Sequence, residues 1–203
     1  MENRLATGIS YLFHPLLIPA YVMALLLNIN NSNLLLVPVV YKIILLGIVF
    51  LTTVLFPLLF TYLLLRINMI SSFFLHKREE RIYVILAVSI FYYLTYYLLK
   101  GIHLSVIFGY FMLGSTLLAI LTLVINFYFR ISLHMIGIGS VPGLFLGLSL
   151  KFGINFNGVL MEGIFAAGMI GFARLRLNAH SPAEIYSGYL LGATILTFLM
   201  ILL

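Results

Sequence analysis

The sequence has no cysteine, no aspartate and no tryptophan, and only five of its 203 residues are acidic. The absence of cysteine excludes disulfides and thiolate metal sites. Charged residues make up only 8% of the chain, whereas hydrophobic residues make up 64%. A soluble globular protein is excluded as well, because no soluble fold buries that share of apolar surface. We therefore expect an integral membrane protein that is surrounded by membrane lipids.

The chain also lacks a polar linker between hydrophobic blocks, which predicts a single transmembrane domain over residues 1–203. Its first residues lead into a long apolar run without the small-residue pattern of a signal-peptide cleavage site. The formal net charge of +6 suits anionic headgroups or an anionic substrate. Nothing in the sequence indicates binding to nucleic acid.

Seven apolar segments are long enough to cross a bilayer, which takes about 20 helical residues. They predict an all-α integral membrane protein with about seven transmembrane helices in one bundle. The fifth segment is short and rich in glycine, which predicts close packing against a neighbouring helix. The second is overlong and contains Pro57, so we expect it to tilt or bend. The segments span roughly residues 7–28, 36–65, 82–99, 104–128, 134–150, 155–173 and 183–202.

If the segments cross alternately, one face of the membrane receives residues 1–6, 66–81, 129–134 and 174–182. This face carries eight of the eleven Lys and Arg residues. Three polar clusters are expected to meet there. They comprise residues 76–81, 132–134 and 174–184.

The third cluster has the form of a helix start. Ser181 suits the N-cap, Pro182 the first helical position and Glu184 the third. His180 therefore precedes a helix N-terminus, where unpaired N–H groups and the helix dipole favour phosphate. Glu184 could hold one ring nitrogen of His180 and leave the other to attack a substrate. Alternatively, Glu184 is only a capping residue, and the arginines of this cluster only extend to lipid headgroups.

The other two clusters add a second histidine and a further arginine. Ser132 could cap the helix that begins near His134, and His134 could act as a general acid beside a nucleophilic His180. The alternative is an ordinary interfacial histidine at a helix end. In the first cluster, Arg81 stands at the membrane boundary, where its guanidinium could bind phosphate oxygens. The other members of that cluster fit a solvated loop with salt bridges.

Three more polar residues lie within apolar segments. His14 could line the same pocket, or it could be a hydrogen-bonded core histidine. Lys42 and Glu162 lie at similar depth in two different segments, which predicts a buried ion pair.

Taken in order, the three clusters resemble the motifs of the membrane-bound type 2 phosphatidic acid phosphatase superfamily. The third family motif reads Ser-Arg-x5-His-x3-Asp. Arg174, His180 and Glu184 fit its spacing, with Ala173 in place of Ser and Glu in place of Asp. The second motif reads Pro-Ser-Gly-His, of which Ser132 and His134 are kept.

The first family motif reads Lys-x6-Arg-Pro and is the least well matched. Arg81 corresponds to the arginine of this motif, and Phe74 stands at the lysine position. Lys77 or Arg78 could take the place of that lysine. The whole resemblance covers about residues 75–200.

The resemblance implies a phosphatase-type helical core and a hydrolase of a lipid phosphate or polyprenyl pyrophosphate that needs no metal or cofactor. It implies that His180 is the nucleophile that forms a phosphohistidine, that Glu184 supports it, and that His134 protonates the leaving oxygen. The residues that it implies for substrate binding are Arg174, Arg81, Lys77 or Arg78, and the Ser132 backbone. The expected location is the bacterial inner (cytoplasmic) membrane, and similarity to bacterial polyprenyl pyrophosphate phosphatases favours a site that faces outward.

The weak first motif supports a second hypothesis. In it, the chain is a non-catalytic relative that acts as a subunit of a membrane complex or as a lipid-binding module. Loss of the motif lysine removes a phosphate ligand, and Glu in place of Asp moves the carboxylate by one methylene. Transport is a more distant third hypothesis, because no pair of broken-helix repeats is apparent.

Overall fold

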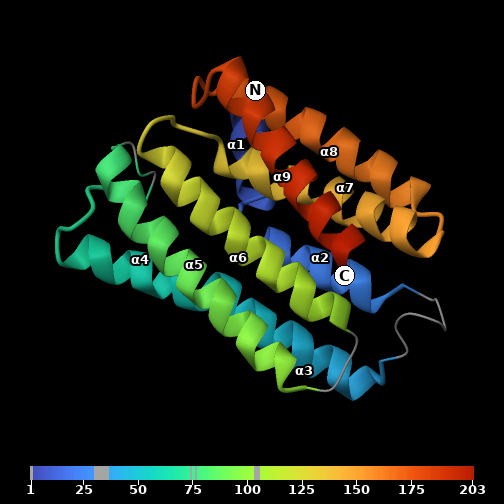
Figure 1. The fold of residues 1–203 in the computed structure, drawn as a ribbon. Coiled ribbons are helices and arrows are strands. Elements are labelled where there is room, and N and C mark those ends of the chain that lie inside the picture. Colours follow the sequence, from blue (N-terminus) through green and yellow to red (C-terminus); the bar gives the residue numbers. More distant parts are fainter. Residues whose placement is uncertain (1, 30–36, 74, 76, 103–105) are drawn as a thin grey trace. The chain divides into compact units, whose positions relative to one another are not determined.

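A computed structural model describes residues 2–29, 37–73, 75, 77–102 and 106–203. This part of the chain consists of helices and the loops between them and contains no strand, as the sequence predicts (Figure 1). Helix α3 runs through a π-helical segment, Leu51–Leu55, into α4. The helices are α1 (Glu2–Leu12), α2 (Ile18–Leu27), α3 (Val39–Phe50), α4 (Phe56–Arg66), α5 (Arg78–Lys100), α6 (Val106–Asn126), α7 (Leu133–Phe152), α8 (Asn157–Arg176) and α9 (Pro182–Leu202).

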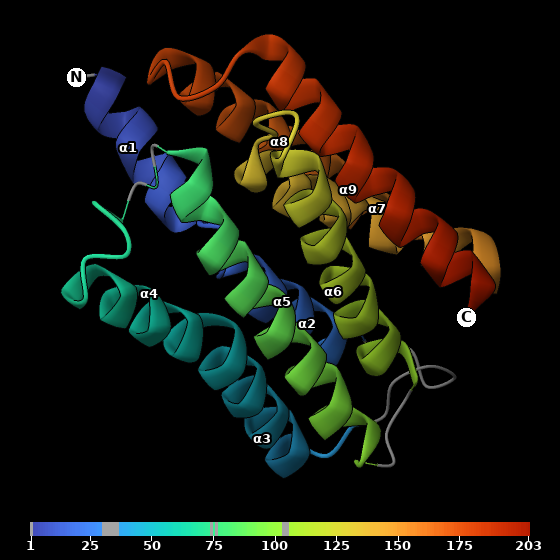
Figure 2. The same cartoon turned by 60° about the vertical axis from the view of Figure 1, so that its left-hand side comes forward.

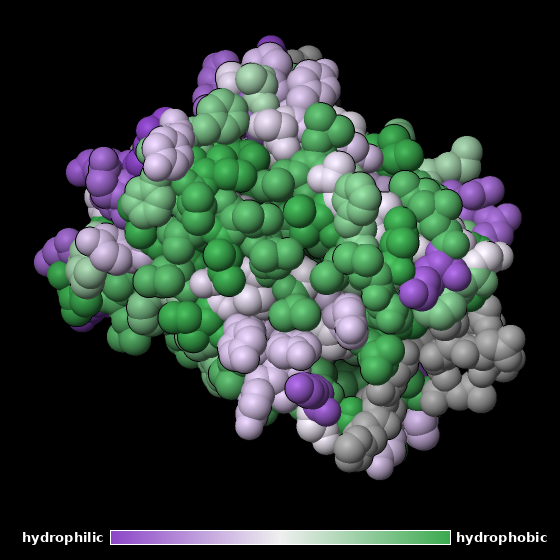
Figure 3. Space-filling model, in the orientation of Figure 1, coloured by the Kyte–Doolittle hydropathy of each residue, from purple (hydrophilic) through white to green (hydrophobic). Residues whose placement is uncertain are grey.

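Six of the described helices are long and apolar enough to cross a membrane. They are the continuous helix Val39–Arg66 and helices α5, α6, α7, α8 and α9. Large apolar side chains stay exposed along them, such as Met161 at 72% and Phe165 at 69%. Apolar residues also cover most of the face drawn in Figure 3. Such a surface is unfavourable in water, so the fold is that of an integral membrane protein.

The expected crossing over residues 7–28 is not a single helix. Helix α1 ends at Leu12 and α2 begins at Ile18, and each is too short to cross a bilayer. Pro15 explains the break, because it lacks a backbone donor and disfavours a helical conformation at the preceding His14. The count of seven crossings is therefore not confirmed. Each of the other six expected segments corresponds to one of the six long helices.

The helices form two compact units. The first unit comprises residues 1–18 and 129–203, and thus α1, α7, α8 and α9. The second comprises residues 19–128, and thus the helices from α2 to α6. This division follows the packing of the helices, and the expectation of one transmembrane domain stays a prediction.

In the first unit, α7 and α9 pack backbone against backbone at glycine residues (Figures 1 and 2). A methyl group on Gly192 would overlap the backbone of Ile136 and Ser140. One on Gly188 would lie 2.9 Å from the carbonyl oxygen of Ser132. The α7 glycines that meet the other helix in the same way are Gly139, Gly143 and Gly147. The close packing predicted for the glycine-rich segment is confirmed, and it sets the start of α7 against the first turns of α9.

In the second unit, α5 packs against α6 and against the helix over residues 39–66. The π-helical segment lies just before Pro57, where the sequence predicts an irregularity, because proline cannot continue the regular hydrogen-bond ladder. Thr95 Oγ1 on α5 donates a hydrogen bond of 2.7 Å to Thr52 Oγ1 within this segment. A buried polar contact thus ties the irregular turn to α5.

Candidate functional site

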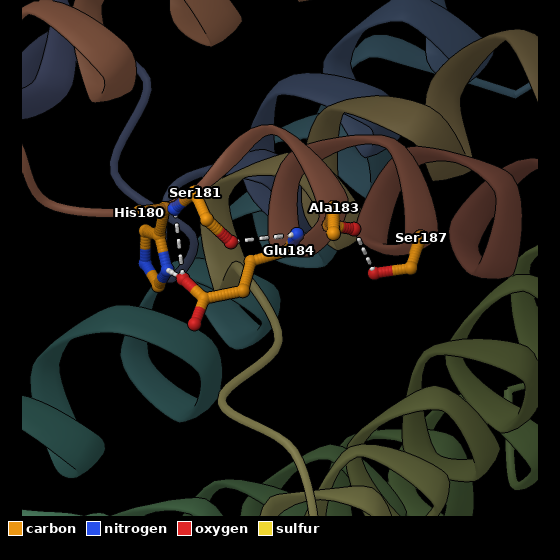
Figure 4. A network of polar contacts seen from close by, with 5 residues as sticks. All are labelled: His180, Ser181, Ala183, Glu184 and Ser187. Atoms are coloured by element: carbon orange, nitrogen blue, oxygen red, sulfur yellow. Dashed lines mark hydrogen bonds and ion pairs between the residues drawn. The ribbon is translucent and has the colours of Figure 1, made fainter.

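Helix α9 begins as the sequence predicts, with Ser181 at the N-cap and Pro182 as its first residue. The Ser181 N–H donates to Glu184 Oε2 over 3.1 Å, and the Glu184 N–H donates to the Ser181 hydroxyl over 3.4 Å (Figure 4). This reciprocal capping box satisfies two donors that the helix itself cannot. It also fixes the position of the Glu184 carboxylate.

The same carboxylate oxygen holds His180, whose Nδ1 lies 2.7 Å from Glu184 Oε2 (Figure 4). The His180 side chain is only 6% exposed. Because an ionised carboxylate can only accept, Nδ1 carries the proton, and in the neutral ring the lone pair is on Nε2. Glu184 is therefore both a capping residue and the partner that fixes the tautomer of His180.

Ser132 joins the second sequence cluster to the third. Its backbone N–H donates to the carbonyl oxygen of Glu184 over 3.2 Å. Ser132 occupies the N-cap position of α7, but its side chain makes no capping hydrogen bond, and its Oγ is buried without a partner. The backbone donor expected to hold phosphate is thus engaged in this structure. The hydroxyl is the part of Ser132 whose hydrogen-bonding capacity is unused.

His134, the second residue of α7, contacts α1 and the turn that follows it. Its Nε2 lies 3.1 Å from the carbonyl oxygen of Ser10, which places a proton on Nε2. The ring of His14 packs edge-on against that of His134, with 5.7 Å between centroids and 79° between ring planes. The charges of Arg174 and His180 also act on His134. Three histidines from three separate parts of the sequence therefore share one cluster.

Two arginines complete this cluster. Arg174 and Arg130 are near enough for their charges to act on each other, and the Nε atoms of both are buried without a hydrogen-bond partner. The described acidic side chains of the first unit do not neutralise these arginines. Glu184 is bound to His180, and Glu162 precedes Arg174 on α8 by a helical rise of about 18 Å. An anion would stabilise these two guanidinium groups. The half-buried residues His14, Arg130, His134, Arg174 and His180 are called the basic cluster below.

His14 is held by the turn that separates α1 from α2. The Leu16 N–H donates to His14 Nδ1 over 3.4 Å, so the neutral ring carries its proton on Nε2. Burial and, to a lesser extent, the charge of Arg174 lower the pKa of His14 below its usual 6.5. His14 is therefore neutral at pH 7 when no anion is bound.

The first sequence cluster lies in the second unit, around the start of α5. Lys77 Nζ is 3.8 Å from Glu80 Oε1, and its side chain is 68% exposed. The Arg78 guanidinium donates to the Tyr128 carbonyl oxygen over 3.1 Å. Both side chains thus make contacts within their own unit, and the Lys77–Glu80 pair has the i,i+3 spacing of the solvated, salt-bridged loop.

Arg81 is buried in the second unit at 4% exposure. Phe74, at the position of the missing motif lysine, lies outside the described residues. Convergence of Arg81 with the basic cluster stays a prediction. The ion pair expected between Lys42 and Glu162 also stays one, because these residues belong to different units.

Sequence reasoning left two members of the basic cluster out of the candidate site. Arg130 received no role, although it stands only two residues before Ser132. The sequence is equally compatible with a hydrogen-bonded core histidine at position 14, although His14 directly precedes the proline that breaks an apolar segment. A histidine at such a break was the one available signal. No spacing in the sequence pairs His14 with His134, because 120 residues separate them.

The fold and these contacts define an all-helical integral membrane protein with a histidine–carboxylate pair beside a half-buried basic cluster. Comparison with protein-family models, with curated proteins and with solved structures finds no match to the chain. Among the described residues, no group of three or more His, Cys, Asp or Glu side chains could hold a metal ion. The function is therefore inferred from the chemistry of the side chains themselves.

Proposed function

We propose that the protein is an integral membrane phosphatase that hydrolyses a lipid phosphate or a polyprenyl pyrophosphate through a phosphohistidine. One observation carries the proposal: the 2.7 Å bond from His180 to Glu184 belongs to a cluster that contains two arginines with unpaired Nε donors. Phosphoryl transfer needs such a combination of an oriented nucleophile and groups that stabilise negative charge. The motif resemblance supports the same activity, a phosphatase-type core and a bacterial inner-membrane location.

In the first step, Arg130 and Arg174 bind oxygens of the phosphoryl group. His180 Nε2 attacks phosphorus, and the bond between phosphorus and the lipid oxygen breaks. His134, which must carry a second ring proton once the phosphoryl anion is bound, donates that proton to the leaving oxygen. The carboxylate of Glu184 stabilises the positive charge that develops on the attacking ring.

In the second step, water attacks the phosphorus of the phosphohistidine. His134, now neutral, takes a proton from the water, the N–P bond breaks, and inorganic phosphate leaves. The proposal needs no metal ion or cofactor. By the motif resemblance, Arg81 with Lys77 or Arg78 would also bind phosphate, and the unpaired hydroxyl of Ser132 would add a donor.

Phosphate release by the purified protein in detergent tests this proposal. The substrates would include several lipid phosphates and a polyprenyl pyrophosphate, and each would be compared with the His180→Ala variant. We expect that variant to lose phosphate release while it keeps the elution profile and thermal midpoint of the native protein. Chelators should leave the native activity unchanged. Chelator-sensitive turnover, or full turnover by His180→Ala, would refute the phosphohistidine mechanism.

His134→Ala separates the general acid from the nucleophile. We expect this variant to slow hydrolysis strongly for alkyl phosphates and least for aryl phosphates. An aryl oxygen leaves readily without a proton, so the general acid matters less there. An equal loss for both substrate types would remove His134 from the role of proton donor.

A non-catalytic membrane subunit or lipid-binding module is the second candidate. It is favoured by the contacts of Lys77 with Glu80 and of Arg78 with the Tyr128 carbonyl oxygen, because neither side chain is then held ready for substrate. This candidate predicts that the protein binds lipid phosphates but releases no phosphate from them. Binding measured beside the release assay distinguishes the two functions.

A further inference from the structure

The turn after α1 brings a histidine from outside the three motifs into the basic cluster. We propose that His14 is a ligand of the bound phosphate and takes up a proton when the anion binds. Anion affinity and the charge of His14 are then coupled. This inference rests on the proposed function, because the anion is the phosphoryl group that the basic cluster would hold.

The geometry of the turn orients His14 as a donor. The Leu17 N–H donates to the His14 carbonyl oxygen over 2.8 Å, and the Leu16 N–H donates to His14 Nδ1 over 3.4 Å. The opposite ring nitrogen, Nε2, therefore carries the proton of the neutral ring. No described residue accepts a hydrogen bond from this nitrogen. The half-buried His14 ring thus packs edge-on against His134, and no described residue provides an acceptor for its N–H.

The charge that acts on His14 is positive. Arg174 faces it from α8, and His134 faces it from the start of α7. Arg130 acts on Arg174, and His180 acts on His134. Neither α1 nor the turn adds a charged group in contact with His14 among the described residues. A proton on His14 is therefore unfavourable without an anion, and a bound phosphate reverses this balance.

Thermodynamic linkage makes the coupling measurable from both sides. If bound phosphate raises the pKa of His14, protonation of His14 must strengthen phosphate binding by the same factor. If phosphate raises the titration midpoint of His14 by about one pH unit, the protein with protonated His14 binds phosphate about tenfold more tightly than the protein with neutral His14.

The first experiment follows the titration of His14 in the native protein, and a variant serves only to assign the signal. Histidine rings are labelled with carbon-13, and their NMR signals are recorded in detergent across the pH range with and without inorganic phosphate. The His14 signal is the one that the His14→Gln variant lacks. We expect phosphate to raise its midpoint by about one pH unit. An unchanged midpoint at saturating phosphate would overturn the proposal.

The second experiment measures the affinity for inorganic phosphate in matched variants. His14→Gln keeps a polar side chain that cannot be charged, whereas Arg4→Gln removes a full charge from an exposed position on α1, the helix that precedes His14. We expect His14→Gln to weaken binding by about tenfold at low pH and to flatten its pH dependence relative to the native protein. Arg4→Gln should change neither. Equal effects of both variants would reduce His14 to a contributor of general charge and overturn the proposal.

The outcomes separate this inference from the proposed function. If the protein releases phosphate but His14 does not respond to phosphate, the proposed phosphatase activity stands and the ligand role of His14 is rejected. If His14 responds to phosphate but no lipid phosphate is hydrolysed, the ligand role stands and the proposed phosphatase activity is rejected. His14→Phe adds a test of packing, because it retains an aromatic ring beside His134. If His14→Phe binds phosphate as tightly as the native protein, the ligand role is rejected as well.

Discussion

A single carboxylate oxygen of Glu184 serves both helix capping and the orientation of His180. It accepts from the Ser181 N–H and from His180 Nδ1, at 3.1 and 2.7 Å. The helix start thereby becomes the support of the proposed nucleophile. Capping and the orientation of His180, which the sequence presents as alternatives, are two roles of one carboxylate oxygen.

The two consequences can be separated by substitution. Glu184→Gln removes the negative charge that stabilises a charged His180, so we expect phosphate release to fall by roughly a hundredfold or more. Ser181→Ala removes the capping hydroxyl but keeps the Glu184–His180 contact. It should lower the free energy of unfolding by about 1 kcal/mol and leave turnover nearly unchanged. Release assays and unfolding curves of both variants would check this, and equal losses of turnover would contradict it.

The lowered pKa of His14 predicts how the fold responds to acid. Below pH 6.5 the unfolded chain binds a proton at His14 that the folded protein does not bind. The contribution of His14 to stability is thus complete above that pH and is lost as the pH falls toward its lower folded value. We expect His14→Gln to lose less of its thermal midpoint than the native protein between about pH 7.5 and about pH 5.5. Parallel acid sensitivity of the two proteins would contradict this.

At the scale of the residue, local chemistry was predictable and distant contacts were not. The capping box and the pairing of His180 with Glu184 follow from spacing within one turn of helix. The contact of His14 with His134 depends on how separate helices pack, and no periodicity encodes it. The engaged backbone of Ser132 is unpredictable for the same reason, because its acceptor belongs to α9.

At the scale of the element, the glycine contacts of α7 with α9 bring two of the three polar clusters together. The carbonyl oxygen of Ser132 lies directly over Gly188, one helical turn after Glu184. Any side chain at that glycine would separate the start of α7 from the start of α9. The packing of these helices is therefore a condition for the site.

Alanine substitutions at glycines test this dependence with an internal control. Gly192→Ala would place a methyl group into the backbone of α7, so we expect a loss of about 1–3 kcal/mol of stability. Gly168→Ala on α8 meets nothing within 4 Å and should be neutral or stabilising by up to about 1 kcal/mol. Thermal unfolding in detergent would measure both. Similar midpoints for the two variants would show that close approach of the helices is not required.

The irregular elements show where hydrophobicity alone stops being informative. The run over residues 7–28 is apolar enough for a crossing, but Pro15 divides it into α1 and α2. Hydropathy averages over such a break, whereas the backbone chemistry of one proline decides it. The π-helical segment before Pro57 is likewise set by local hydrogen bonding and leaves no trace in the apolar pattern.

At the scale of the whole molecule, the broken first segment changes the expected topology only at its beginning. From residue 39 onward, the six long helices correspond to the last six of the seven expected crossings. If each of them crosses once, the loops that precede α5, α7 and α9 open on the same side of the membrane. The shared face inferred for the three polar clusters thus does not depend on residues 7–28. It stays a prediction that membrane-topology mapping can test.

The absence of cysteine from the chain makes this mapping direct, because each introduced cysteine is the only thiol. Lys77→Cys and Ala183→Cys lie at exposed positions beside the first and third clusters, and Lys100→Cys and Lys151→Cys lie at exposed positions near the other ends of the helices. A maleimide that cannot cross membranes should label the first pair from one side of sealed vesicles and the second pair only from the other. Labelling after detergent treatment controls for thiols that are buried rather than shielded by the membrane. Labelling of Lys77→Cys and Ala183→Cys from opposite sides would exclude Arg81 from the site, and phosphate would then have to be held by the basic cluster alone.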